Sequence, residues 1–152
     1  MAQTLNHTPA DVVRQVLIDL GLGSDLPANG LTTPLSDWPV YKGLEPSDPD
    51  DVITVYNTAG RPDVRDMFGK LYTSYGVQLR VRAADPDQGW LKADALRTGV
   101  SEVVRQQVNV GATAYFVQCF NRIGDVLELG RDAPTTNRQL YTLNPTVRIR
   151  LL

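Results

Sequence analysis

The chain has 152 residues, of which 42% are hydrophobic and 21% are charged. This length and composition are ordinary for one globular domain with a substantial core, so we expect a single domain over residues 1–152 and exclude general disorder. The formal net charge of −2 at pH 7 argues against a protein that binds nucleic acid through a surface that is basic all over.

Few residue types that support catalysis or metal binding are present. Cys119 is the single cysteine and His7 the single histidine. This excludes an internal disulfide and a cysteine zinc cluster, and it makes histidine-pair metal sites and serine–histidine hydrolase sites poor candidates. Asp48, Asp50 and Asp51 offer oxygen ligands for Ca²⁺, but aspartates that cap turns explain this group better. We therefore expect no catalytic residue, no cofactor and no bound metal.

Targeting signals are also missing from the sequence. No segment is long and apolar enough to span a bilayer, and the first residues lack the charged and then apolar layout of a signal peptide. We expect a protein that is made in a cytosol and has no membrane partner.

Charge is distributed unevenly along the chain. Residues 1–51 carry eight acids against Arg14 and Lys42, a net charge of −6, whereas the remainder carries +4. Two interpretations stay open. Like signs cluster by chance on a solvated surface, or acidic and basic parts of neighbouring copies pair head to tail.

The first predicted element is a helix from Thr8 to Leu20. Thr8 is a favourable N-cap, Pro9 takes the first helical position at no cost, and Asp11 suits the positive end of the helix dipole. Apolar residues at three- and four-residue spacing give this helix one face for the core.

Residues 24–51 are predicted to form a long loop, because their five prolines forbid a long helix. Within the loop, Trp38 to Lys42 is a candidate edge strand, since a strand tolerates proline only at an edge or bulge. Trp38 and Tyr41 are candidate interface anchors, or they fold back as covers over the core.

Val52 to Tyr56 is a predicted strand of β-branched and aromatic residues. Turn-forming residues in Asn57 to Pro62 are expected to end it, and a short helix or turn is expected from Val64. The charged side chains of this region form either a solvated loop or a contact surface. They are Arg61, Asp63, Arg65, Asp66 and Lys70.

Two later segments alternate apolar and polar residues, which is typical of strands with one buried face. They are Val77 to Arg82 and the end of a predicted final strand from Gln139 to Leu152. Their arginines are expected to point outward from one sheet, as plain surface charge or as contacts for carboxylates of a neighbouring copy. These arginines are Arg80, Arg82, Arg148 and Arg150.

Between these two segments, Asp85 to Gln107 is predicted to be the long helix that packs across the sheet, with Asp85 as its N-cap. Ala112 to Asn121 and Val126 to Gly130 are expected to form a hairpin with Gly124 in its turn. Cys119 in the first of these strands is interpreted as a small packing residue. Together the elements predict an α+β fold, with a mixed, mostly antiparallel sheet and two helices packed on one face.

The centre of the chain carries a recognisable order of short motifs. Pro49-Asp50 precedes an apolar strand, Gly60-Arg61-Pro62 follows it, and a strand of the form VQLRVR then leads into a helix. Over residues 49–105 this pattern resembles the tail terminator proteins of long-tailed, siphovirus-type bacteriophages, a group close to phage minor capsid and head–tail joining proteins.

The resemblance implies a structural virion protein that caps the head-proximal end of the tail tube. It would act as a ring of identical copies, six by expectation, end tube polymerisation and provide the surface for head attachment. The implied partners are other copies of itself, the tail tube protein, a head-completion (stopper) protein, and genomic DNA that passes through the lumen without sequence specificity. The implied location is the virion neck, after assembly in the host cytoplasm.

Two alternatives stay open at this point. The first is a head–tail connector, of the stopper or adaptor kind, or a minor capsid protein. The second belongs to another class, a small ligand-binding or enzyme domain, which would need a concave pocket with convergent polar groups.

Overall fold

The computed structural model describes residues 4–25, 38–47, 49–65, 71–133 and 137–152. Two helices and eight strands make up these described parts. In chain order they are α1 (Pro9–Asp19), β1 (Val40–Lys42), β2 (Val52–Arg65), β3 (Leu71–Ala83), α2 (Pro86–Ser101), β4 (Val104–Val110), β5 (Thr113–Asn121), β6 (Leu127–Arg131), β7 (Gln139–Leu143) and β8 (Thr146–Leu151).

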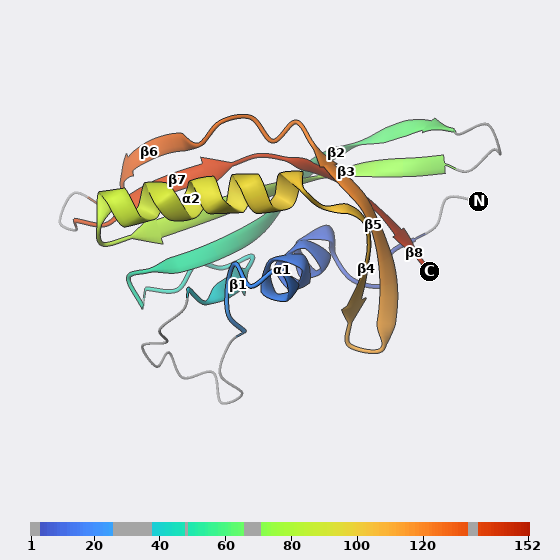
Figure 1. Cartoon of the computed structure of the whole chain (residues 1–152), viewed down its shortest axis with the longest axis horizontal. Coiled ribbons are helices and arrows are strands. Elements are labelled where there is room, and N and C mark those ends of the chain that lie inside the picture. Colours follow the sequence, from blue (N-terminus) through green and yellow to red (C-terminus); the bar gives the residue numbers. More distant parts are fainter. Residues whose placement is uncertain (1–3, 26–37, 48, 66–70, 134–136) are drawn as a thin grey trace.

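The strands form one mixed sheet. β1 pairs with β2 in parallel, and the other pairs are antiparallel. The main path is β1-β2-β3-β8-β5-β4, while β7 pairs with β3 and β6 pairs with β7. Residues of both helices belong to one core cluster with residues of the sheet, and Figure 1 shows how the helices lie beside the strands. This confirms the expected α+β fold. No helix in the described ranges is long and apolar enough to cross a bilayer.

The core lies between the helices and one face of the sheet. Val77, Leu79 and Val81 of β3 are buried, as their alternation predicts. They share a single apolar cluster with Val16 of α1 and Leu96 of α2. The strand pattern and the helical pattern therefore meet in one core.

The local signals at the helix starts are confirmed. The Thr8 hydroxyl accepts a hydrogen bond from the Asp11 N–H at 3.3 Å, and Asp11 accepts one from the Thr8 N–H at 3.0 Å, which makes a reciprocal capping box. At α2, the Asp85 carboxylate accepts a hydrogen bond from the Asp87 N–H at 2.9 Å.

β2 does not end at Tyr56. It continues to Arg65, so the predicted break at Asn57 to Pro62 is wrong. The predicted helix or turn from Val64 is also wrong for Val64 and Arg65, which belong to the strand. The turn-forming residues are absorbed as register shifts against β3 instead. Gly60 permits the backbones of β2 and β3 to approach each other closely, since a Cβ at Gly60 would come within 2.4 Å of the Ser74 carbonyl oxygen.

This continuation produces a two-stranded arm. β3 pairs with β8 only from Ser74 to Gly76, so beyond the Arg61–Ser74 pair, residues 62–65 and 71–73 pair with each other and with no other described strand. Figure 1 shows this β2–β3 arm extending beyond the helices.

α2 ends at Ser101 rather than at Gln107. Val104–Val110 pairs with β5 as β4, because an extended backbone lets Val103 and Val108 be buried while Val104 stays 69% exposed. Tertiary pairing here overrides helix propensity.

The predicted hairpin between Ala112–Asn121 and Val126–Gly130 is wrong. β5 turns back onto β4 through Gly111, whose φ is 58°, and β6 pairs with β7. Gly124 has a φ of 66° but lies in the crossing from β5 to β6. The predicted final strand is likewise divided at Asn144-Pro145 into β7 and β8, which both pair with β3.

Candidate interaction surfaces

Three of the predicted arginines lie on the sheet face opposite to the helices, here called the outer face. Arg80, Arg148 and Arg150 are half-buried there. The Arg80 guanidinium lies 5.1 Å from the centre of the Tyr56 ring, and that of Arg150 lies 4.8 Å from the centre of the Phe116 ring. Stacking on aromatic rings fixes the positions of these charges without removing them.

Arg82 lies on the same face but is only 2% exposed, so the expectation that it points outward into solvent is wrong. Its guanidinium donates hydrogen bonds to the Pro49 carbonyl at 2.7 Å and the Asp50 carbonyl at 3.3 Å. It also lies 3.8 Å from the Glu45 carboxylate. Arg82 therefore holds the end of the proline-rich loop against the outer face.

Arg138, the residue before β7, holds the same loop. Its guanidinium donates a hydrogen bond to the Ser47 carbonyl at 2.6 Å and forms ion pairs with Asp132 at 2.9 Å and Asp50 at 3.5 Å. Burial raises the pKa of the Glu45 carboxyl above its ordinary value of 4.5, although Arg82 acts in the opposite direction. These contacts make Glu45, Ser47, Pro49 and Asp50 a structural strap rather than a free surface.

The two aromatic candidates of the loop have different environments. Trp38 packs partly buried against the core, and the Lys92 ammonium lies 5.9 Å from the centre of its ring. Tyr41 lines a shallow pocket with Leu44, which is 78% exposed. Trp38 thus has the position of a cover over the core, and Tyr41 is the better placed of the two to meet a partner.

The charged segment after β2 is described only in part. Arg61, Asp63 and Arg65 belong to the β2–β3 arm, where the structure gives the backbone course. Asp66 and Lys70 lie outside the described residues.

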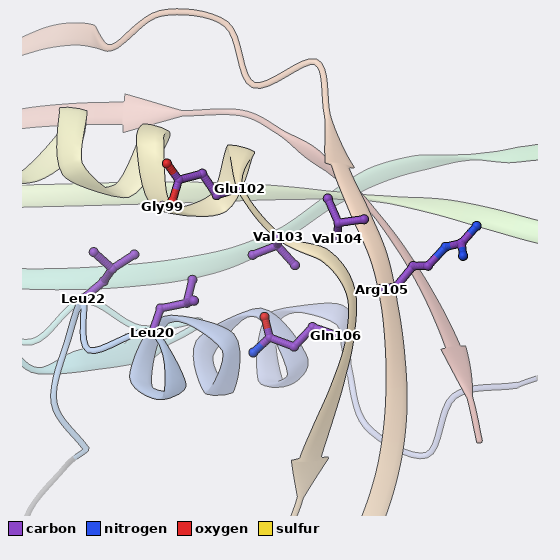
Figure 2. A pocket seen from close by; sticks show the side chains of 8 residues that line it. All are labelled: Leu20, Leu22, Gly99, Glu102, Val103, Val104, Arg105 and Gln106. Carbon is purple, nitrogen blue, oxygen red and sulfur yellow. The ribbon is translucent and has the colours of Figure 1, made fainter.

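A groove that the sequence did not predict lies between the ends of both helices and the start of β4 (Figure 2). It has a volume of about 590 Å³. Leu20 is 38% exposed beside it, and Val104 is 69% exposed. The lining residues are Leu20, Leu22, Gly99, Glu102, Val103, Val104, Arg105 and Gln106. The consecutive valines were the signal for it, since an extended backbone must send one of them outward.

The carboxylates considered for Ca²⁺ are used as caps and ion-pair partners. Asp51 accepts a hydrogen bond from the Ala84 N–H at 3.0 Å, and Asp50 faces Arg138, while Asp48 lies outside the described residues. Within the ranges that the structure covers, no group of three or more histidine, cysteine, aspartate or glutamate residues is arranged to hold a metal ion.

Comparisons with known proteins identify the family. A family model described as "Bacteriophage tail terminator protein" matches residues 17–150. None of the curated proteins matches the chain. Among solved structures, the chain is similar to one from "Virion of native gene transfer agent (GTA) particle", with 14% sequence identity, a TM-score of 0.44, and coverage of 92% of this chain and 91% of that one. Since the family model spans nearly the whole sequence, the chain belongs to the bacteriophage tail terminator family.

Proposed function

We propose that this protein closes the head-proximal end of a phage tail tube as a ring of identical copies, the six that the family resemblance implies. The ring ends tube polymerisation and gives the head a surface to attach to. Membership of the tail terminator family carries the proposal, because the description of this family names the end of the phage tail as the place where its members act.

The mechanism is steric. One side of the ring matches the last ring of tube subunits, while the other side presents surfaces that a further tube subunit does not fit, so growth stops. The β2–β3 arm supports this mechanism, because its backbone projects beyond the helices, where a neighbouring subunit can meet it (Figure 1).

The proposed partners follow from this position in the virion neck. The tail tube protein binds one side of the ring and a head-completion (stopper) protein binds the other. Genomic DNA passes through the lumen and contacts the ring through phosphates at most, which carry no sequence information. Assembly takes place in the host cytoplasm before the head joins the tail.

Tube growth in the presence of the purified protein tests the proposal. Tail tube protein is polymerised with increasing amounts of this chain, and tube lengths and end densities are measured in negative-stain images. We expect shorter tubes with extra density at one end. Tubes as long as those grown with an unrelated protein of similar size would contradict the proposal. Binding to head-completion protein without any binding to tubes would favour the head–tail connector instead.

A further inference from the structure

One end of the molecule is rich in exposed carboxylates. Asp50, Asp51, Asp85 and Asp87 are exposed and surround the start of α2. Two hydrogen bonds bring them together, one from the Ala84 N–H to Asp51 and one from the Asp87 N–H to Asp85. Arg138 neutralises part of this acidic end through Asp50, and the other three carboxylates have no arginine or lysine ion pair among the described residues.

Three arginines lie on the other side, where α2 ends, and they outnumber the exposed acids Glu102 and Asp125 of the same part of the chain. Arg105 lies opposite Gln118 in β5, because Val104 pairs with Cys119 and Gln106 pairs with Val117. Arg122 directly follows β5, and Arg150 of β8 lies beside Phe116 of β5. We call Arg105, Arg122 and Arg150 the basic end.

The two ends lie far apart. The 16 residues of α2 run from the acidic end towards the basic end, and Figure 1 shows β4, β5 and β8 on the side away from the start of α2. A helix of this length spans about 24 Å. A contact between the two ends must therefore join different copies of the chain.

The backbone at the basic end is strained. Arg105 and Arg122 have φ values of 52° and 51°, and no other non-glycine residue in the described ranges has a positive φ. An L-residue pays a conformational cost in this region that glycine avoids. Both arginines are exposed, and their side chains have no hydrogen bond or ion pair within the described residues, so both guanidinium groups are open to a partner.

We propose that the basic end of one copy binds the acidic end of the next copy, and that this head-to-tail contact closes the ring. The inference rests on the ring of the proposed function and assigns its subunit interface. Two different patches that attract each other form a heterologous interface, which generates a ring when the rotation between copies closes. Like ends repel, so the same charges also fix the direction of assembly.

Charge reversal on the full chain tests this contact. Asp50→Lys with Asp87→Lys reverses the acidic end and spares the hydrogen bonds of Asp51 and Asp85. Arg105→Glu with Arg122→Glu reverses the basic end, and a fourth protein carries all four changes. Asp19→Lys with Asp94→Lys is the control for the acidic-end variant, because it makes the same change of charge outside the two named sets and likewise breaks one ion pair, that of Asp94 with Arg97 in place of that of Asp50 with Arg138.

Sedimentation velocity at low ionic strength measures association. The dissociation constant of each single-end variant is expected to be about ten-fold higher than that of the wild type. The dissociation constants of the fully swapped variant and of the control should stay within about three-fold of the wild-type value. Association of the wild type should weaken as salt is added.

Glycine variants separate assembly from folding. Arg105→Gly with Arg122→Gly relieves the backbone strain and removes the charges, so its Tm should not fall while its association weakens. A lower Tm with unchanged association would contradict the role assigned to these arginines.

Other outcomes overturn the contact. The wild type could stay monomeric at low ionic strength, or the fully swapped variant could fail to associate. The arginine reversals could also weaken binding to duplex DNA while the mass of the assembly in solution stays unchanged. The proposed function fails separately, if a protein that forms these rings does not shorten tubes. A monomer that still stops tube growth would keep the function and remove the contact.

Discussion

At the scale of single residues, the same alternating pattern holds arginines with different roles. The alternation of β3 and β8 predicted that their arginines lie opposite the core, and Arg80, Arg148 and Arg150 do so. It could not predict that Arg82 is buried, because the residues that cover it belong to the loop at 45–50, distant in sequence. Local periodicity determines the face of a side chain and not what packs over it.

Arg82 should matter for stability far more than Arg150. Arg82→Ala leaves Glu45 buried without its cation and removes the donor to the Pro49 carbonyl, so the free energy of unfolding should fall by about 3 kcal/mol. Arg150→Ala loses a stacking contact with Phe116 and should cost about 1 kcal/mol or less. Urea unfolding at pH 7 measures both values. Equal losses would show that Arg82 does not hold the loop.

Glu45 should make stability depend on pH in an unusual direction for a carboxyl group. Its pKa is raised in the folded state, so its protonated form favours folding. This contribution is fully present below pH 4.5, its ordinary pKa, and is lost as the pH rises through the folded-state pKa. Glu45→Gln should therefore be at least as stable as the wild type at pH 7, with the difference shrinking towards pH 4. Thermal unfolding across this range checks the sign, and a variant that is less stable only at pH 7 would contradict it.

At the scale of elements, the residues where helices begin were easier to predict than the residues where they end or the strands that pair with each other. The cap residues Thr8 and Asp85 stand in the sequence beside the helices that they begin. The end of α2 has no such local signal, because Glu102, the C-cap, is followed by valines that suit either structure. Their pairing with β5 decides the outcome, and that contact is tertiary.

Two glycines of α2 should respond oppositely to alanine. A Cβ at Gly89 would lie 2.6 Å from the Tyr141 ring and 2.8 Å from the Ala83 Cβ, and the Tyr141 hydroxyl is fixed by a hydrogen bond to the Pro86 carbonyl. Gly89→Ala should therefore destabilise the protein by about 1–2 kcal/mol despite its better helix propensity.

Gly99 provides the matched comparison. A Cβ there would meet only the flexible end of Leu22, which borders the open groove of Figure 2 and can move. Gly99→Ala should be neutral or stabilising by up to about 1 kcal/mol. Urea unfolding of both variants tests the pair, and a destabilised Gly99→Ala would mean that Leu22 cannot move.

At the scale of the whole molecule, the fold class followed from composition and periodicity, but the path of the sheet did not. β3 is the central strand and pairs with β2, β7 and β8, two of which lie far along the chain. A prediction that joins neighbouring strands into hairpins misses such pairings, as it did for β5 and β6. Function depended on the family rather than on any chemical site, since an assembly surface has no obligatory residue type.

The β2–β3 arm gives the most direct test of how shape serves assembly. Replacing residues 62–73 by Asn-Gly joins the paired residues Arg61 and Ser74 through a two-residue turn suited to a hairpin. Of the replaced residues, the described ones, 62–65 and 71–73, pair only with each other, so the free energy of unfolding should change by about 1 kcal/mol or less. Tube capping should be lost, because the projecting surface is gone while the core stays intact.

A second variant separates shape from charge in the same arm. Arg61→Ser, Asp63→Ser and Arg65→Ser keep the arm and remove the charges of its β2 strand, and Asp66→Ser with Lys70→Ser removes those between its strands. If capping fails in the shortened protein and survives in the serine variant, the backbone and length of the arm make the contact. If both fail, the charges make it. Normal capping by the shortened protein would contradict any role of the arm, and the outer face and the groove between α1, α2 and β4 would then be the surfaces that meet the tube.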